Sequence, residues 1–168
     1  MAGRDQYMNF FSMEVTSGAN ASTLVNENYN TGAGVSTQLA WRIHSVEYYS
    51  RGSWSGATDQ HRVTCALSTR KDLSAIPELI DKGTIAVFTG VLNVYGTPAN
   101  AWDNRYPIVQ TFLPPMLVAS PNFTIYFQAN ANFSGQQSAV QNIRIGFTTE
   151  KLTESAYREV FETWNYAN

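Results

Sequence analysis

Few residues in this chain are of the types that hold metal ions, and these few are widely spaced. Two histidines, His44 and His61, and one cysteine, Cys65, are the only His and Cys residues among the 168. A zinc site needs three or four nitrogen, sulfur or oxygen ligands at characteristic spacings, and no H-x-H pair occurs in the sequence. We therefore interpret both histidines as polar residues of strands or strand edges, and we expect no metal and no other cofactor.

The single cysteine lies in the stretch HRVTCALSTR. One cysteine cannot form a disulfide within the chain, so the fold must depend on its apolar core. Cys65 has two interpretations, a reactive thiol or a small apolar side chain on the inward face of a strand. The second is favoured, because unpaired cysteine is among the most buried residue types.

Hydroxyl and carboxyl groups form no recognisable catalytic set either. The segment RGSWSG (51–56) has a serine between glycines, but it lacks the G-x-S-x-G order and the strand–turn–helix setting of a nucleophilic serine. Most acidic residues fall in expected loops and helical turns, and Glu14 and Glu47 lie in the interior of expected strands. A carboxylate pair of the glycosidase kind stays an alternative, but we expect a protein that is not an enzyme.

Aromatic residues are the remaining candidates for a functional site. Five of them fall at expected strand ends or in loops: Tyr48, Tyr49, Trp54, Trp102 and Tyr106. They could fill the ends of a sandwich, contact another protein, or stack on sugars. The last possibility would make the chain a non-catalytic carbohydrate-binding β-sandwich module, in which Trp54 and Trp102 would form the platform.

Composition limits the classes of partner. Hydrophobic residues make up 43% of the chain, whereas charged residues make up only 14%, against about 25% in an average soluble domain. The formal net charge is -2, and the densest basic cluster is the pair Arg70 and Lys71. Strong binding of nucleic acid through phosphates needs a concentrated positive patch, so we do not expect it of this chain.

The sequence also indicates a soluble protein. The beginning, MAGRDQYMNFF, is too polar and too short for a signal peptide. No apolar run approaches the roughly 18 residues that a membrane-spanning helix needs. We therefore expect neither export by a recognisable signal nor a transmembrane segment.

Alternating apolar residues between Gly-, Asn- and Ser-rich turns predict an all-β fold of eight to nine antiparallel strands in one domain, 1–168. The predicted strands cover residues 8–16, 23–30, 37–50, 61–70, 84–96, 105–120, 122–133 and 139–150. The last two are expected to form a hairpin, Gly90 a bulge or bend, and Pro114 with Pro115 a break in pairing. Residues 51–60 are expected to be a loop, and residues 72–83 a short helix or helical turn that Ser74 caps and Gly83 ends.

A second, amphipathic helix is predicted over residues 153–164. Its apolar stripe consists of Ala156, Tyr157, Val160, Phe161 and Trp164. Thr153 lies at the N-cap position, and Glu154 lies near the positive end of the helix dipole. The stripe must cover a surface, either on the sandwich of its own subunit or on a neighbouring subunit.

In its number of strands and in the helix between strands, the chain resembles the single jelly-roll capsid proteins of small icosahedral viruses. The resemblance covers most of the chain as a pattern of elements. It implies a jelly roll, and it implies a structural subunit that assembles with copies of itself into an icosahedral shell of the virion. A second capsid protein is a further candidate partner. One departure is that the N-terminal segment contains one Arg and one Asp, not a basic arm that neutralises a genome.

Under this hypothesis, terminal and loop aromatic residues form the contacts between subunits. The expected interface residues are Tyr157, Phe161, Trp164, Trp102 and Trp54. Replacing Trp164 by alanine, or deleting the chain after Glu150, should then leave soluble subunits that do not assemble. If the truncated chain were unfolded instead, the helix would belong to the core of its own subunit.

Overall fold

We describe the protein from a computed structural model. The structure describes residues 7–17, 23–54, 60–93, 100–103, 107–129 and 138–165, with the side chains at 51–54, 60–62, 91–93, 100–103 and 138–139 left out of the description. The strands are β1 (Asn9–Thr16), β2 (Val25–Asn30), β3 (Leu39–Trp54), β4 (Gln60–Ser68), β5 (Thr84–Asn93), β6 (Asn100–Asp103), β7 (Ile108–Val118), β8 (Asn122–Ala129) and β9 (Ser138–Lys151). The helix is α1 (Glu154–Asn165).

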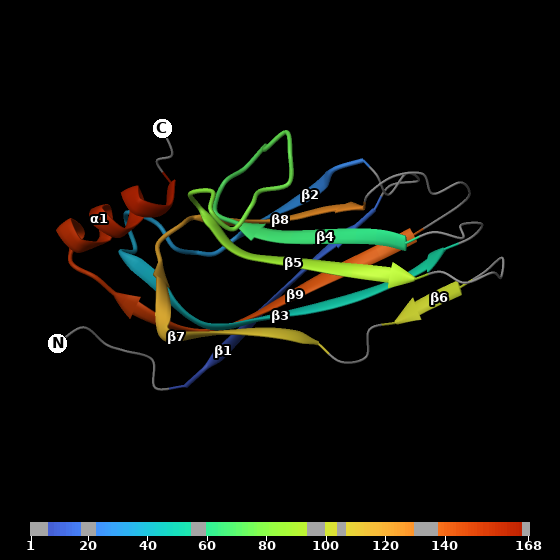
Figure 1. Cartoon of the computed structure of the whole chain (residues 1–168). Helices are drawn as coiled ribbons and strands as arrows, with labels where there is room; N and C mark the ends of the chain where they lie inside the picture. The colour runs from blue at the N-terminus through green and yellow to red at the C-terminus, as the bar shows by residue number, and fades with distance from the viewer. Residues whose placement is uncertain are drawn as a thin grey trace.

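The strands form two antiparallel sheets that face one another (Figure 1). One sheet has the order β1-β9-β3, with β7 and β6 both on the far side of β3, and the other has the order β2-β8-β4-β5. β7 pairs with β3 between Trp41 and Tyr48, and β6 pairs with it between Arg51 and Trp54. Since β6 and β7 use successive stretches of β3, this sheet is four strands wide at any point. The fold is thus nearly all-β and β-sandwich-like, as the sequence predicts.

The core lies between the sheets and follows from the alternation of apolar residues. Trp41 is its aromatic centre, with the ring stacked on Phe147 at a centroid distance of 3.7 Å. The same indole makes edge-to-face contacts with Phe123 of the opposite sheet at 5.1 Å and with Phe11 at 5.4 Å. Each such pair contributes about 0.5–1.5 kcal/mol beyond the area that it buries. The contact with Phe123 therefore joins the two sheets, whereas the contacts with Phe147 and Phe11 pack aromatic rings within one sheet.

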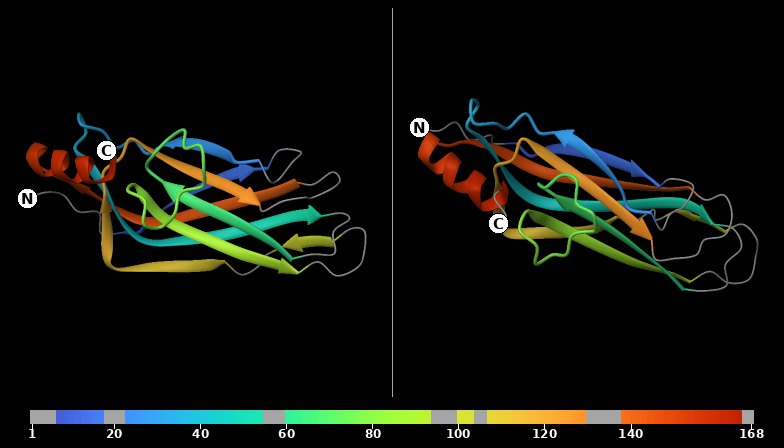
Figure 2. Two further views of the ribbon diagram at one scale, coloured as in Figure 1. Left: turned by 45° about the horizontal axis from the view of Figure 1, so that its top comes forward. Right: turned by 90° about the horizontal axis from the view of Figure 1, so that it is seen from above.

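The predicted C-terminal helix and its cap are confirmed. The Ala156 amide donates to Thr153 Oγ1 (3.3 Å), and the Tyr157 amide donates to the Thr153 carbonyl (2.8 Å). Glu154 lies in the first turn and pairs with Arg158 at 2.7 Å, one turn further on. Figure 2 shows the helix at one end of the sandwich, beside the bend in β7.

Of the short helix or helical turn predicted at residues 72–83, the helix is wrong, because this connection between β4 and β5 is a loop whose end contains turns. Asp72 has a φ of 57°, in the left-handed region, which turns the chain away from a helical path. The Leu73 amide donates to the Tyr126 hydroxyl (3.2 Å), so a strand side chain takes a backbone group that a helix would use. A segment this short has little helical stability of its own in water, and these tertiary contacts override it.

The hairpin predicted between the last two strands is also wrong. β8 pairs with β2 and β4, whereas β9 pairs with β1 and β3, so the two strands lie in different sheets. Residues Phe123 to Phe127 of β8 are all buried, as expected of a strand with neighbours on both sides. Closeness in sequence favours a hairpin, but both edges of β8 are paired with strands from distant parts of the chain, so no edge is left for β9.

Three smaller expectations are resolved by the strand registers. β3 continues to Trp54, so the loop predicted at residues 51–60 begins later than expected. Gly90 lies opposite Val63 in an unbroken register, and the bulge in the β4–β5 pair lies between Leu67 and Ser68 instead. The interruption predicted at Pro114 and Pro115 is confirmed, because pairing of β7 with β3 skips these residues, which cannot donate a ladder hydrogen bond.

Candidate interaction site

The outer face of the five-stranded sheet carries the predicted C-terminal helix over one of its ends. Tyr157 of α1 is fully buried there against Ala40 of β3 and Ala119, which follows β7. Leu117, Leu152, Val160 and Phe161 are partly buried around this cluster. The two alanines leave room for the tyrosine ring, and a larger side chain at either position would push the helix away. We call this region, defined by Ala40, Ala119 and Tyr157, the covered end.

Hydrogen bonds at the C-terminal end of α1 fix the helix to both sheets. The Trp164 indole N–H donates to the Leu117 carbonyl (2.8 Å), while the Trp164 carbonyl accepts from Thr69 Oγ1 (2.8 Å). Asn165 Nδ2 donates to the Ala119 carbonyl (2.8 Å). A Cβ at Gly83 would lie 2.8 Å from Thr69 Oγ1 and 3.0 Å from the Trp164 carbonyl, and its φ is +83°, so only glycine fits this junction. The helix is therefore part of its own subunit's fold.

These contacts settle where the predicted interface residues lie in the chain. Tyr157 is buried inside the subunit, and Phe161 and Trp164 are half-buried against it. Trp54 and Trp102 lie in the β3–β6 pair, where their side chains are outside the described residues. That any of these residues contacts a neighbouring subunit stays a prediction. Since deletion after Glu150 would remove Tyr157 from a buried site, we now expect this truncation to destabilise the subunit itself.

Further along the same face, apolar side chains remain exposed near the middle of the sheet. Phe10 of β1 is 55% exposed, and Met8 is exposed as well. Val109 of β7 is also exposed, and it lies across β9 and β3 from Phe10. Phe10 lies opposite Gly146, and a Cβ at Gly146 would lie 3.2 Å from Met8 Sδ and 3.4 Å from Phe10 Cε1. The glycine therefore lets both side chains lie close against β9. We call the group Met8, Phe10, Val109 and Arg144 the bare patch.

Arg144 gives the bare patch its charge. Its guanidinium donates to Glu47 Oε2 from Nε (2.8 Å), and Nη2 lies 2.6 Å from the same oxygen. The guanidinium carbon also lies 4.8 Å from the centre of the Phe10 ring, a cation–π distance. The Arg144 side chain is 42% exposed, against 13% for that of Glu47. The cation is therefore more accessible to a partner than the carboxylate that balances it.

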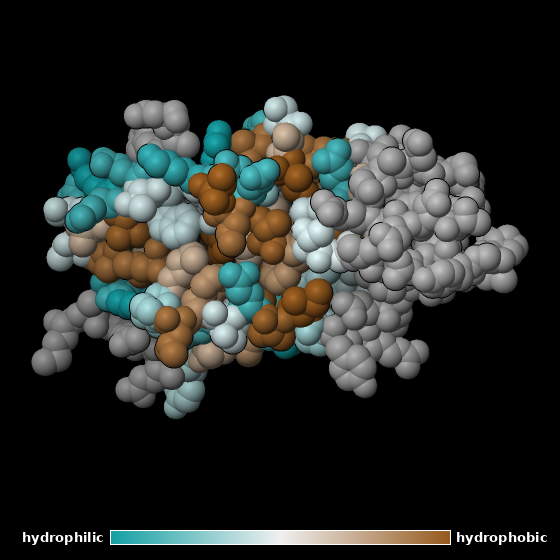
Figure 3. All heavy atoms as spheres, in the orientation of Figure 1, coloured by the Kyte–Doolittle hydropathy of each residue, from teal (hydrophilic) through white to brown (hydrophobic). Residues whose placement is uncertain are grey.

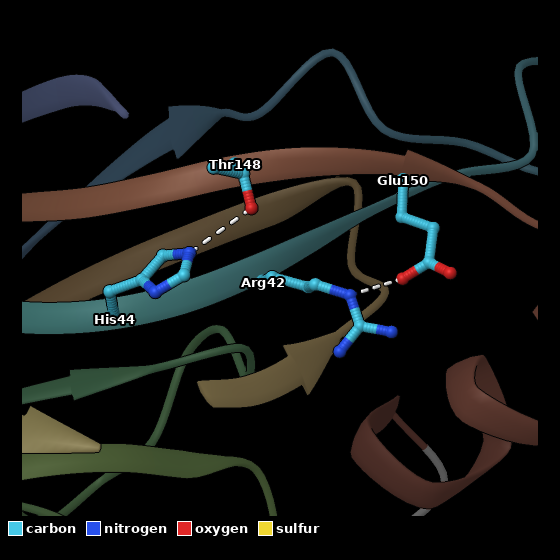
Figure 4. A network of polar contacts seen from close by, with 4 residues as sticks. All are labelled: Arg42, His44, Thr148 and Glu150. Atoms are coloured by element: carbon cyan, nitrogen blue, oxygen red, sulfur yellow. Dashed lines mark hydrogen bonds and ion pairs between the residues drawn. The ribbon is translucent and has the colours of Figure 1, made fainter. Parts of the chain in front are cut away.

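Between the covered end and the bare patch, a row of polar pairs joins β3 and β9 (Figure 4). Arg42 forms an ion pair with Glu150, and His44 Nε2 lies 3.1 Å from Thr148 Oγ1. The irregularity between Ile43 and Ser45 places His44 at a bulge, so its ring faces β9 without disturbing the inner row. Glu47 and Glu150 each form an ion pair with an arginine. The described part of the chain also contains no group of three or more His, Cys, Asp and Glu that could hold a metal ion.

A second exposed apolar group lies on the connection between β4 and β5. The sequence analysis assigned these residues to a helix and did not predict their exposure. Leu79 is 60% exposed and Ile80 is 87% exposed. They are the central residues of a tight turn in which the Asp81 amide donates to the Glu78 carbonyl (3.0 Å). The Glu78 amide donates in return to Asp81 Oδ2 (2.8 Å). Such positions usually hold Gly, Asn, Asp or Ser, so two large aliphatic residues there are a signal that the sequence already contained.

The surface as a whole mixes apolar and polar side chains. Figure 3 shows several apolar groups separated by hydrophilic ones on one face of the molecule. No single continuous apolar band covers the described part of this face. Contacts with a partner would therefore involve limited patches, each with charged residues beside it.

Two polar features lie in the interior of the sandwich, a group of hydrogen bonds at Gln141 and the thiol of Cys65. Tyr48 and Ser50 both donate to Gln141 Oε1 inside the sandwich. Burial raises the pKa of Cys65, so its thiol stays protonated and unreactive at neutral pH. Cys65 is fully buried on the inward face of β4, which confirms its interpretation as a small apolar residue.

Comparisons with known proteins add no family to this description. No protein-family model matches the chain, and a search of curated proteins gives no significant match. In the described ranges, no helix is both long enough and apolar enough to cross a membrane.

Proposed function

We propose that the two sheets form a jelly roll and that the protein is the capsid subunit of a virus. The strand order supports the first part. β1 pairs with β9, β2 with β8, β3 with β6 and β7, and β4 with β5, so the partners are nested from the ends of the chain towards its middle. A long antiparallel ribbon folded over on itself in this way produces two four-stranded sheets, which is the arrangement of a jelly roll.

The nested strand order is the observation that carries the proposal. Jelly rolls occur in viral capsid proteins, in lectin domains and in cupins. A metal-dependent cupin would need converging ligands, whereas the described residues supply no such cluster. The exposed apolar groups of the bare patch and of the Glu78–Asp81 turn favour a protein that associates with others. Copies of the same chain are the proposed partners, with a second capsid protein as a further candidate and the virion as the location.

The charge of the chain agrees with a shell subunit that does not bind the genome directly. The formal net charge is -2, and the densest basic cluster in the sequence is the pair Arg70 and Lys71. A binding site for phosphates would need a larger group of cations close together. Packaging would then depend on another component of the particle.

Size-exclusion chromatography with light scattering, followed by negative-stain electron microscopy of early peaks, tests this function. The proposal predicts closed shells of many 18.7 kDa chains. A strict monomer across a concentration and salt series, with and without nucleic acid, would contradict self-assembly.

A carbohydrate-binding module is the second candidate, and one observation favours it. Trp102 lies opposite Gly52, and Trp54 lies opposite Asn100, so the two tryptophans occupy diagonal positions of the β3–β6 pair. Neighbouring aromatic residues at a strand pair could stack on successive sugars. A glycan array with the wild type and with Trp54→Ala and Trp102→Ala variants tests this function, and binding that both variants lose would support it.

A further inference from the structure

We propose that the turn Glu78–Asp81 of one subunit docks on the bare patch of the next subunit. This inference rests on the proposed function, because it names the contact by which copies of the chain would assemble. We call the turn, with Leu79 and Ile80 at its tip, the knob. Three observations carry the proposal: the knob is held in shape, it matches the bare patch in chemistry, and the two lie on opposite faces of the sandwich.

The knob is fixed by hydrogen bonds before any partner arrives. Besides the two bonds that close the turn, the Thr84 amide donates to the Asp81 carbonyl (3.1 Å) at the start of β5. At the other side of the loop, the Tyr126 hydroxyl donates to the Arg70 carbonyl (3.0 Å) and accepts from the Leu73 amide. A preordered apolar tip loses little conformational entropy on binding. Two exposed aliphatic side chains at such a tip do not stabilise the subunit itself, because they bury little surface within it.

The knob and the bare patch are complementary in charge as well as in hydrophobicity. Glu78 and Asp81 flank the two aliphatic residues, and Lys82 lies beyond the turn. On the patch, the accessible charge is the Arg144 cation, because its partner Glu47 is the more buried of the two. An apolar tip with acidic residues beside it therefore fits an apolar patch with a cation beside it. Charge complementarity of this kind orients partners and disfavours wrong pairings.

The positions of the two regions determine what the contact would build. Phe123, Ile125 and Phe127 of β8 belong to the core, so Tyr126 faces outward, and the β4–β5 loop covers it. The knob is thus on the outer side of the four-stranded sheet, whereas the bare patch is on the outer side of the five-stranded sheet. Figure 1 shows the loop and β1 on opposite sides of the molecule. A contact between two different surfaces of identical subunits repeats head to tail, and it closes into a ring or shell when the rotation allows it.

Complementary knock-out variants test the contact. The knob variant carries Leu79→Ser and Ile80→Ser, and the patch variant carries Phe10→Ser and Val109→Ser. Val35→Ser is the matched control, since it removes one exposed apolar side chain from a different loop. Circular dichroism and thermal unfolding first establish that each variant is folded, which is expected because all five replaced side chains are exposed.

Neither knock-out variant should assemble alone, whereas the control should assemble like the wild type. An equimolar mixture of the two variants should form a dimer of about twice the mass of one chain, because the knob variant keeps its patch and the patch variant keeps its knob. That dimer cannot grow, since its two remaining surfaces are both disabled. Glu78→Lys should weaken wild-type assembly, with Glu78→Gln intermediate.

Other results would overturn the inference, and they separate it from the proposed function. If the wild type forms shells and the knob variant forms them equally well, the contact is wrong while the function stands. The contact is also wrong if the mixture of folded variants stays monomeric. If the wild type itself is monomeric under all conditions, the proposed function and the contact fail together.

Discussion

Two regions of one sheet face differ in whether their apolar residues are covered. At the covered end, Ala40 and Ala119 are small, and Tyr157 from the helix of the same chain fills the space above them. At the bare patch, Phe10 and Val109 project from the opposite edge strands β1 and β7, and both side chains remain exposed. Strands β3, β7 and β9 run beneath or beside both regions.

This difference shows that an aromatic residue on an amphipathic helix and an aromatic residue on a strand can have opposite roles. The helix aromatics look like an interface in sequence, yet the structure uses Tyr157 to complete the subunit. Phe10 of β1 looks like an ordinary strand residue in sequence, yet it is left at the surface, whereas Met13 and Val15 of the same strand are buried. Burial within the chain therefore points to stability for the first group, and exposure points to association for the second.

Replacing Tyr157 by alanine should have the largest effect on stability. We expect a loss of about 3–5 kcal/mol in the free energy of unfolding, the range found when a buried large aromatic residue is truncated. Phe10→Ala, at the bare patch, should change it by less than about 0.5 kcal/mol, as exposed positions usually do. Chemical denaturation of both variants provides the measurement.

Tyr157→Phe is the matched control for that experiment. The Tyr157 hydroxyl is buried and has no hydrogen-bond partner among the described residues, so removing it should leave stability unchanged or slightly increased. A large loss in Tyr157→Phe would mean that the hydroxyl has a partner after all. Equal losses of unfolding free energy in Tyr157→Ala and Phe10→Ala would contradict the difference between the covered end and the bare patch.

Enlarging the side chain of Ala40, which lies beneath Tyr157, should have the next largest effect on stability. Ala40 is fully buried beneath the helix, and Ala40→Met should cost about 1–3 kcal/mol, as overpacking of a filled core does. Thr111→Met, on the exposed part of β7, is the control and should be close to neutral. Melting temperatures measured by calorimetry would show whether only the first substitution displaces α1.

Alkaline pH should weaken the covered end and the core before it affects the bare patch. Burial raises the pKa of Tyr157, of Tyr48 and of Cys65 in the folded protein. Below the unfolded values, near 8.5 for cysteine and 10 for tyrosine, all three groups are neutral in both states, so their contribution to stability does not change. Above these values the unfolded chain ionises more readily, and stability should fall as pH rises.

Denaturation midpoints measured between pH 7 and 11 test this dependence. The decline should begin above pH 8.5 in the wild type, and Cys65→Ala should delay its start towards pH 10. Tyr157→Phe should make the later part shallower. A stability that rises through this range would contradict the assignment of these groups as buried and neutral.

The smallest effect should come from the ion pair on the solvent side of α1. Both side chains are well exposed, with 64% for Arg158 and 60% for Glu154. Arg158→Ala should cost only about 0.3–0.5 kcal/mol, the usual contribution of such a pair on a helix. Denaturation in low and high salt should show that even this difference is reduced by screening.

The sequence was sufficient for eight of the nine strands and for the C-terminal helix, because these elements have a regular apolar period. The four-residue strand β6 was not predicted. Thr153 was identified as the cap of α1 from its residue type alone, and the structure confirms it. Sequence pattern failed where pairing depends on distant partners. The hairpin expected from β8 and β9 was wrong because β8 has neighbours on both sides, which come from strands that precede it by many residues.

The candidate site was harder to predict for a related reason. An apolar stripe shows that a helix packs on something, but it does not show which surface, and here Ala40 and Ala119 supply that surface from remote strands. Exposure of Phe10, Leu79 and Ile80 depends on the absence of a covering element, which no local pattern encodes. The knob was missed because its residues favour a helix, while hydrogen bonds to Tyr126 hold the loop.

Sedimentation velocity of the wild type beside Phe10→Ser and Tyr157→Phe, at matched concentrations, tests the central claim most directly. We predict large assemblies for the wild type and for Tyr157→Phe, and a folded monomer with an unchanged melting temperature for Phe10→Ser. Assembly of Phe10→Ser to the same size and extent as the wild type would contradict the account.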